Sequence, residues 1–385
     1  MPITGDQASF GAATPPTPST APPDRERYAG LDGIRALALL LVLLEHASGT
    51  PRFPFPQVHA WLPSTGFFGV QIFFVLSGFL QTSLLLADER RHGRVLVRRF
   101  YAKRLLRIAP LCVIYVLAVA ACSAVSRHPL TFLDVASVLF CFRHVVDGAP
   151  LFAHFWSLSI EILFYLTWPL LLARLPAPRR AGTALAAVFV IPLTSLAIQA
   201  IHPDTTALHL SQFFRGEAIL LGCWLAFRRV ADPLMPAERK NDWAASLAIL
   251  GGFVAGLAML HLSTRATDAQ NALLRWLQIF PALLMVVAAL RCRQGWLADV
   301  LNSRSARWLA LVSFGTYIWQ QIFFFARPQE LLIPGLPLPL LYQAVWFPGN
   351  VVAALAAGAL SYRLLERPLH PWRAKLAAAL IPNRA

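Results

Sequence analysis

Charged residues are scarce in this sequence. Only 14% of the 385 residues are Asp, Glu, Lys or Arg, whereas 57% are hydrophobic and the mean hydropathy is +0.56. Soluble domains carry about 25% charged residues, so the composition is that of a membrane protein. Apolar runs near twenty residues recur, each long enough to cross about 30 Å of hydrocarbon as a helix, and the alternating pattern of a transmembrane β-barrel is absent. We therefore expect an all-α, polytopic integral membrane bundle of about ten transmembrane helices.

Cysteines are few, and none has the paired spacing of a metal site. A disulfide framework or a zinc site is therefore not expected, and no metal is assigned. The five cysteines are Cys112, Cys122, Cys141, Cys223 and Cys292. The first 27 residues lack a basic segment leading into an apolar one, so we interpret them as a disordered cytoplasmic tail and not as a signal peptide.

Acidic residues are also few, at 19 against 34 basic ones, which gives a net charge of +15. The predicted spans are 31–49, 66–86, 105–125, 155–173, 182–201, 208–227, 243–262, 273–290, 308–326 and 340–362. With the N-terminus in the cytoplasm, 26 of the 34 Lys and Arg lie on cytoplasmic segments. This asymmetry follows the positive-inside rule, so the charge indicates topology and no nucleic-acid partner. We expect a multi-pass protein of the cell (inner) membrane with both termini cytoplasmic, a transmembrane domain at 28–370 and a C-terminal cytoplasmic tail at 371–385.

The first span contains residues that a lipid environment should exclude. A charge at the centre of a spanning helix costs about 2.5–3.5 kcal/mol on insertion scales. Arg35 and His46 are eleven positions apart, which places them on one helix face about 16 Å apart along its axis. Taken alone, Arg35 is explained equally well by snorkelling to the cytoplasmic surface, and His46 by a hydrogen bond within the bundle. Glu45 points about 100° away from His46, so their adjacency in the sequence is no evidence of a dyad.

The loop after the second span has eight basic residues within positions 90–107. Among them, Arg104 and Arg107 are three apart and share a helix face, and Arg99 lies just before them. Guanidinium groups suit phosphate oxygens, so these three residues are candidates for a phosphate-bearing ligand. Topology and anionic lipid headgroups explain part of the same charge.

The fourth predicted span has a carboxylate, Glu161, a few residues in from its outer end. A carboxylate at that depth can orient an imidazole that acts as a general base, which makes Glu161 a candidate partner for His46. The alternative is an ion pair between helices, for instance with Arg215 in the sixth predicted span.

These segments, in order, resemble the acyltransferase 3 family. Leu31 to His46 resembles its Arg-x10-His signature, Gly69 to Phe79 its second motif, and Arg104 to Pro110 its third. The later matching segments are Trp156 to Glu161 with Phe164-Tyr165, Arg215 to Gly222, Ser313 to Trp319, and Glu366-Arg367-Pro368. The resemblance covers about residues 28–370.

The resemblance implies an O-acyltransferase that moves an acyl group, in this case acetyl, from cytoplasmic acyl-CoA to a hydroxyl of a sugar, glycolipid or glycoside. Acyl-CoA would be a donor substrate, with no permanently bound cofactor. Arg35, Arg99, Arg104 and Arg107 would bind the donor, and His46 and Glu161 would be catalytic. The supporting or acceptor-side residues would be Gln71, Ser159, Arg215 and Gln320.

Two positions depart from the family pattern. Gln71 stands where an acidic residue is usual, and Gln320 stands where a His is usual. An amide can form hydrogen bonds but cannot carry a proton, so His46 remains the expected base and Glu161 the expected carboxylate. The sequence also lacks the additional extracytoplasmic domain common in members that act on polysaccharide, which favours a lipid-linked sugar or a small glycoside as acceptor.

A transporter or flippase of an anionic lipid or sugar is the alternative function. Buried Arg, Glu and His residues are also typical of transporters. Repeated halves and paired broken helices are absent from the sequence, which favours the acyltransferase.

Overall fold

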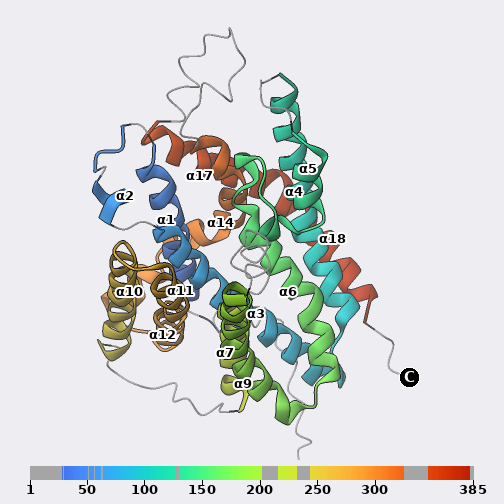
Figure 1. Ribbon diagram of the computed structural model, residues 1–385. Coiled ribbons are helices and arrows are strands. Elements are labelled where there is room, and N and C mark those ends of the chain that lie inside the picture. Colours follow the sequence, from blue (N-terminus) through green and yellow to red (C-terminus); the bar gives the residue numbers. More distant parts are fainter. Residues whose placement is uncertain are drawn as a thin grey trace, which may run out of the picture.

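The computed structural model describes residues 28, 30–50, 52–55, 57–61, 64–125, 130–201, 216–231, 243–324 and 346–381. Within these residues every regular element is a helix, which confirms the all-α class (Figure 1). The elements are α1 (Leu31–Ser48), α2 (Gln57–Trp61), α3 (Thr65–His92), α4 (Val97–Val125), α5 (Phe132–Leu139), η1 (Arg143–Val145), η2 (Pro150–Phe152), α6 (Phe155–Arg174), α7 (Ala177–Ile201), α9 (Glu217–Ala231), α10 (Trp243–Ser263), α11 (Asp268–Leu277), α12 (Ile279–Ala289), α13 (Trp296–Leu301), α14 (Arg304–Phe323), α17 (Gly349–Ser361), η3 (Tyr362–Glu366) and α18 (Arg367–Ala379).

Five of the described helical segments are long and apolar enough to cross a membrane. They are Thr65–His92, Val97–Ala121, Phe155–Arg174, Trp243–Ser263 and Gln270–Ala289. Each of the ten predicted spans falls at least partly on a helix, but the number ten is not confirmed. Helix α1 carries three charged residues in its 18, and the described parts of α9 and α17 are only 15 and 13 residues long. The protein is thus a membrane protein with several apolar helices.

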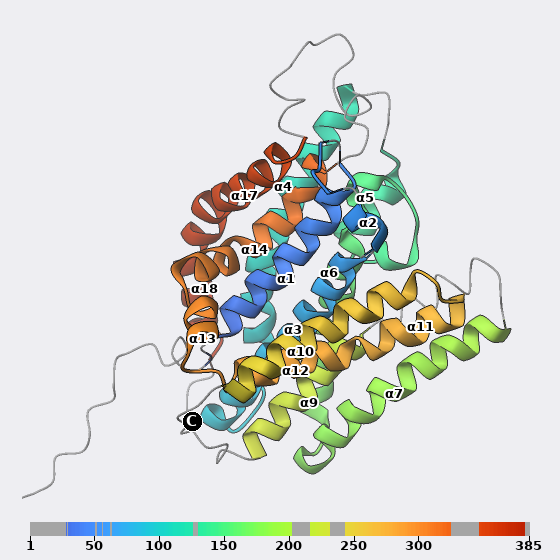
Figure 2. The same cartoon turned by 90° about the vertical axis from the view of Figure 1, so that its left-hand side faces the viewer.

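Helix α1 lies inside the bundle and is covered on two sides by α3 and α14 (Figure 2). Two glycines permit close approaches to α1, Gly33 with α13 and Gly69 with α3. A Cβ on Gly33 would lie 2.5 Å from the Cα of Leu301, and one on Gly69 would lie 2.5 Å from the carbonyl oxygen of Ala38. Helix α17 packs on α14, and α18 packs on α4. The C-terminal helix α18 therefore covers a helix from the N-terminal half of the chain.

Helices α3 and α9 approach most closely at a pair of glycines. A Cβ on Gly78 would lie 1.8 Å from the carbonyl oxygen of Ile219, and one on Gly222 would lie 2.1 Å from that of Val75. Lipid chains are as apolar as Leu side chains, so helices in a membrane associate through close packing of small residues. The contact fixes the face of α3 that points away from α1.

The connection between α4 and α6 forms a folded segment at the upper end of Figure 1, built around Asp134 on α5. Its carboxylate accepts hydrogen bonds from the backbone N–H of Ala149 at 2.5 Å and from the hydroxyl of Thr131 at 2.7 Å. Burial alone would raise the pKa of Asp134, but these hydrogen bonds and the charge of Arg143 outweigh it and hold the pKa below its usual value. Segment 131–147 is therefore a short capped helix followed by a tightly held turn.

Two ion pairs tie helices together at the opposite end. Arg99 at the start of α4 binds Asp88 of α3 with an N–O distance of 2.6 Å, and Arg180 of α7 binds Glu89 of α3, also at 2.6 Å. The Arg180 pair is bidentate, which adds geometric specificity to the charge attraction. The polar end of α3 is thereby fixed to two neighbouring helices.

Candidate active site: a cationic cavity between five helices

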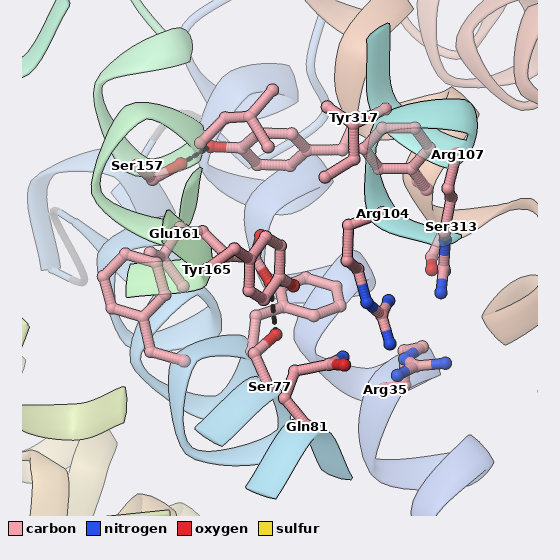
Figure 3. A pocket seen from close by; sticks show the side chains of 16 residues that line it. Arg35, Ser77, Gln81, Arg104, Arg107, Ser157, Glu161, Tyr165, Ser313 and Tyr317 are labelled. Carbon is pink, nitrogen blue, oxygen red and sulfur yellow. Dashed lines mark hydrogen bonds between the residues drawn. The ribbon is translucent and has the colours of Figure 1, made fainter. Parts of the chain in front are cut away.

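A cavity of about 100 Å³ lies between α1, α3, α4, α6 and α14. That volume has room for several water molecules or a slender chain of atoms. Figure 3 shows three arginines at one side and the pair Ser157 and Tyr317 at another. The wall between them is partly apolar. The lining residues are Arg35, Val70, Phe73, Phe74, Ser77, Gln81, Arg104, Arg107, Ile108, Ser157, Leu158, Glu161, Tyr165, Ser313, Phe314 and Tyr317.

The three arginines that line the cavity are Arg35, Arg104 and Arg107, as the sequence predicts for a phosphate site. Arg35 comes from the first turns of α1, and the other two lie one turn apart on α4. Within the described residues, no carboxylate lies within ion-pair distance of any of the three. Aromatic rings support two of them at 5.5 to 5.9 Å, and Nε of Arg104 is buried without a hydrogen-bond partner. Unpaired guanidinium groups in a cavity favour an anionic ligand.

Glu161 lies in the same cavity, facing these arginines. Its carboxylate accepts hydrogen bonds from the hydroxyl groups of Ser77 on α3 and Tyr165 one turn along α6. Its charge acts on both Arg35 and Arg104. The structure therefore places Glu161 with the arginine cluster, and its hydrogen bonds within the described residues do not include His46.

Ser157 and Tyr317 close the cavity on the side away from the arginines. Their hydroxyl oxygens are 2.5 Å apart, and the Tyr317 hydroxyl also donates a hydrogen bond to the backbone oxygen of His154 at 3.1 Å. The ring of His154 packs against that of Tyr317 with centroids 5.7 Å apart. The hydroxyl pair thus connects the cavity to the turn just before α6.

His46 lies near the far end of α1 from Arg35, half-buried, and does not line the cavity. Its ring stacks on Phe324 at 6.0 Å, and it lies close enough to His154 for their charges to interact. The neighbouring Glu45 faces elsewhere and accepts a hydrogen bond from the backbone N–H of Gly66, in the first turn of α3.

The remaining predicted residues that the structure describes do not line the cavity. Arg99 is engaged by Asp88 in the ion pair described above. Gln71, Ser159 and Gln320 are buried, and neither amide atom of Gln320 has a hydrogen-bond partner among the described residues. Arg215 lies outside the residues that the structure describes.

Two residues of this region were missed by the sequence interpretation. His154 is 4% exposed; neither ring nitrogen makes a hydrogen bond of normal geometry, although the backbone of Ile318 is within reach. Gln81 is 5% exposed, lines the cavity, and has an Oε1 without a partner in the described chain. The available signal was the same as for Arg35: a polar residue within or directly beside an apolar run.

The described helices form an all-α membrane bundle around a cavity lined by three arginines. The comparison with known families is more specific, because the acyltransferase 3 family, described as an acyltransferase domain, matches residues 28–377. The chain belongs to this family.

Curated relatives extend the same comparison. The chain is 27% identical over 370 residues to the peptidoglycan O-acetyltransferase OatA of Listeria monocytogenes, covering 90% of this chain and 56% of the relative. It is 27% identical over 381 residues to the O-acetyltransferase OatA of Staphylococcus aureus, covering 92% and 59%. With the putative peptidoglycan O-acetyltransferase YrhL of Bacillus subtilis the identity is 26% over 369 residues, covering 88% and 54%. The chain thus spans between half and three-fifths of the length of these relatives, and no solved structure matches it.

Proposed function

We propose that the protein is an integral membrane O-acyltransferase that moves an acetyl group from cytoplasmic acyl-CoA to a sugar hydroxyl. The observation that carries the proposal is the cluster of Arg35, Arg104 and Arg107, which lines a buried cavity without a carboxylate in ion-pair distance among the described residues. Helix α1 carries both one of these arginines and His46, so a single helix links an anion site to a candidate base.

The donor is proposed to bind with its phosphates at the arginine end of the cavity. Guanidinium groups form charge-assisted hydrogen bonds with phosphate oxygens and stay protonated, so they suit a polyanionic donor. A cavity of about 100 Å³ is too small for the nucleotide but has room for the slender arm that carries the thioester. The acyl end of that arm would then point towards Ser157 and Tyr317.

His46 is proposed as the general base on the opposite side of that hydroxyl pair. It removes the proton from the acceptor hydroxyl while the hydroxyl oxygen attacks the thioester carbonyl carbon. The new C–O bond forms as the C–S bond breaks, and the leaving thiolate of CoA takes up the proton. No metal or further cofactor is required by this balance.

The acceptor is proposed to be a hydroxyl of a cell-wall sugar, reached from the extracytoplasmic side. Two of the relatives carry peptidoglycan O-acetyltransferase in their names, and the third is an O-acetyltransferase. His46 lies towards the end of α1 that is remote from the basic loop between α3 and α4, which suits a donor and an acceptor that arrive from opposite sides of the membrane.

The test is transfer by the purified full-length chain in detergent. Radiolabelled acetyl-CoA is incubated with soluble peptidoglycan fragments or with the lipid-linked disaccharide precursor, and the label is located by mass spectrometry. An O-acetylated sugar together with free CoA is expected. The proposal is rejected if neither product is released. It is also rejected if the chain, placed in vesicles instead of detergent, takes up the acceptor without acylating it, and this outcome would favour the transporter.

A further inference from the structure

We propose that Gln81 recognises an amide of the donor's pantetheine arm and thereby selects acyl-CoA over simpler thioesters. The inference rests on the proposed function and names a binding residue for it. Gln81 lies on α3 one turn after Ser77, so its side chain is on the same helix face and enters the same cavity. Figure 3 shows its amide end near the guanidinium groups of Arg35 and Arg104.

The first observation is that the Oε1 of Gln81 is a buried acceptor without a partner among the described residues. Its side chain is 5% exposed and its Oε1 accepts no hydrogen bond from any described residue. A buried acceptor left unpaired loses the hydrogen bonds it would make in water, so native proteins keep few of them. An unpaired acceptor on a cavity wall is explained when a ligand supplies the donor.

The second observation is that the other polar side chains of the cavity either only donate or already make hydrogen bonds within the described chain. Arginine side chains only donate. Ser77 and Tyr165 donate to Glu161, Ser157 and Tyr317 bind each other, and the Ser313 hydroxyl donates to the backbone oxygen of Ala310 at 2.8 Å. The hydroxyl oxygens keep lone pairs that can accept, but among the described lining residues Gln81 Oε1 is the buried acceptor that the protein leaves without any hydrogen bond.

The ligand chemistry follows from this inventory. The arm of acyl-CoA between the pyrophosphate and the thioester carries two secondary amides, and each amide N–H needs an acceptor when it leaves water. A Gln side chain can accept from such an N–H and donate to a neighbouring amide oxygen, so it is complementary to the arm. Its place beside Arg35 and Arg104 is the first stretch of the cavity that an arm would meet beyond bound phosphates.

The test compares the wild-type chain with Gln81→Met, which keeps the length of the side chain and removes the amide. Gln278→Met is the matched control. Gln278 is 1% exposed and also has an unpaired Oε1, but it lies between α11 and α12, outside the cavity. We expect the KM for acetyl-CoA to rise about tenfold in Gln81→Met with little change in kcat, and to stay unchanged in Gln278→Met.

A pair of phosphate-free donors separates recognition of the amide from any effect on the arginines. S-acetylpantetheine has both amides and S-acetylthioglycerol has none. The ratio of their kcat/KM values is expected to fall about tenfold in Gln81→Met relative to the wild type. An unchanged ratio would overturn the inference, and if Gln81→Met cannot be purified, the same ratio is measured with Gln81→Asn, whose shorter amide withdraws from the ligand. Absence of transfer by the wild type would instead reject the proposed function.

Discussion

The hydroxyl of Ser77 on α3 donates a hydrogen bond to the carboxylate of Glu161 on α6. Tyr165 donates a second one from the same helix as Glu161, so the carboxylate joins two helices at the wall of the arginine cavity. Its position beside Arg35 and Arg104 indicates that it balances their charge when no anionic ligand is bound.

Glu161→Gln is expected to lower kcat without raising the KM for acetyl-CoA. Removing the negative charge leaves the arginines more attractive to phosphate. The amide oxygen of Gln can still accept from Ser77 and Tyr165, but as neutral hydrogen bonds that are weaker by about 1 kcal/mol each, so the melting temperature should fall slightly. A raised donor KM with unchanged kcat would contradict this role.

His46→Ala is expected to abolish transfer while binding of CoA stays near the wild-type level. Loss of a positioned general base costs about 10²–10⁴-fold in rate. Turnover is measured by release of free CoA, and donor affinity by calorimetry. If the variant retains more than roughly a third of wild-type turnover, which is far above that range, the imidazole of His46 has a structural role and is not the base.

Arg104→Lys and Arg107→Lys are expected to raise the KM for acetyl-CoA and leave kcat nearly unchanged. Lysine keeps the charge but loses the planar fork that matches phosphate, so it is only a partial replacement. Added salt should weaken donor binding to the wild type, because the contacts are ionic. The control is Arg94→Lys in the exposed turn between α3 and α4, for which no change is expected. An unchanged donor KM in both Arg104→Lys and Arg107→Lys would rule out this phosphate site.

Gly78→Ala and Gly222→Ala are expected to destabilise the bundle severely. The added methyl group meets the backbone of the facing helix at 1.8 and 2.1 Å, so α3 and α9 must move apart. Overpacking of this kind costs about 1–3 kcal/mol or more. Gly251→Ala on α10 is the control, since its Cβ meets nothing within 4 Å. Melting temperatures in one detergent compare the three, and equal values would contradict the close packing.

The capped segment around Asp134 is expected to lose stability in acid. The pKa of Asp134 is lowered in the folded protein, so its carboxylate contributes fully to stability above the unfolded pKa of about 3.9. That contribution is lost as the pH falls through the lower pKa of the folded state. Asp134→Asn should therefore have a lower melting temperature than the wild type near neutral pH. The gap between the two melting temperatures should become smaller below about pH 4. A difference that stays constant from pH 7 to pH 3 would assign Asp134 no such role.

The sequence predicts the helical class and singles out the three arginines that line the cavity, because both depend on local signals. Apolar runs locate helices, and Arg35, Arg104 and Arg107 stand out as charges at the ends of such runs. The position of Glu161 depends instead on how α3, α4 and α6 rotate against each other. Depth along a helix can be estimated from the sequence, but the direction in which a side chain points is set by packing, and the structure turns Glu161 towards the arginines.

Gln81 and Arg99 show the same limit of the sequence, which gives too little weight to the first residue and too much to the second. Gln81 lies in the middle of an apolar run and carries no charge, so the sequence gives it little weight, yet it enters the cavity. Arg99 shares the basic loop with Arg104, but an acidic residue eleven positions earlier binds it. Pairing between different helices decides which cation remains available for a ligand, and the periodicity of the sequence does not reveal that pairing.

The position of α1 has a consequence for how the chain is made. The backbone N–H of Gly30, just before this helix, binds the side chain of Asn302, and Gly33 packs on Leu301. Helix α1 leaves the ribosome before α3, which can cover one of its sides soon afterwards, but the other side waits for α13 and α14, some 270 residues later. During that interval an arginine-bearing helix stands partly uncovered in the membrane, where an unpaired polar side chain is costly. Insertion factors that shield half-built helices should therefore act on this protein until its last quarter has been synthesised.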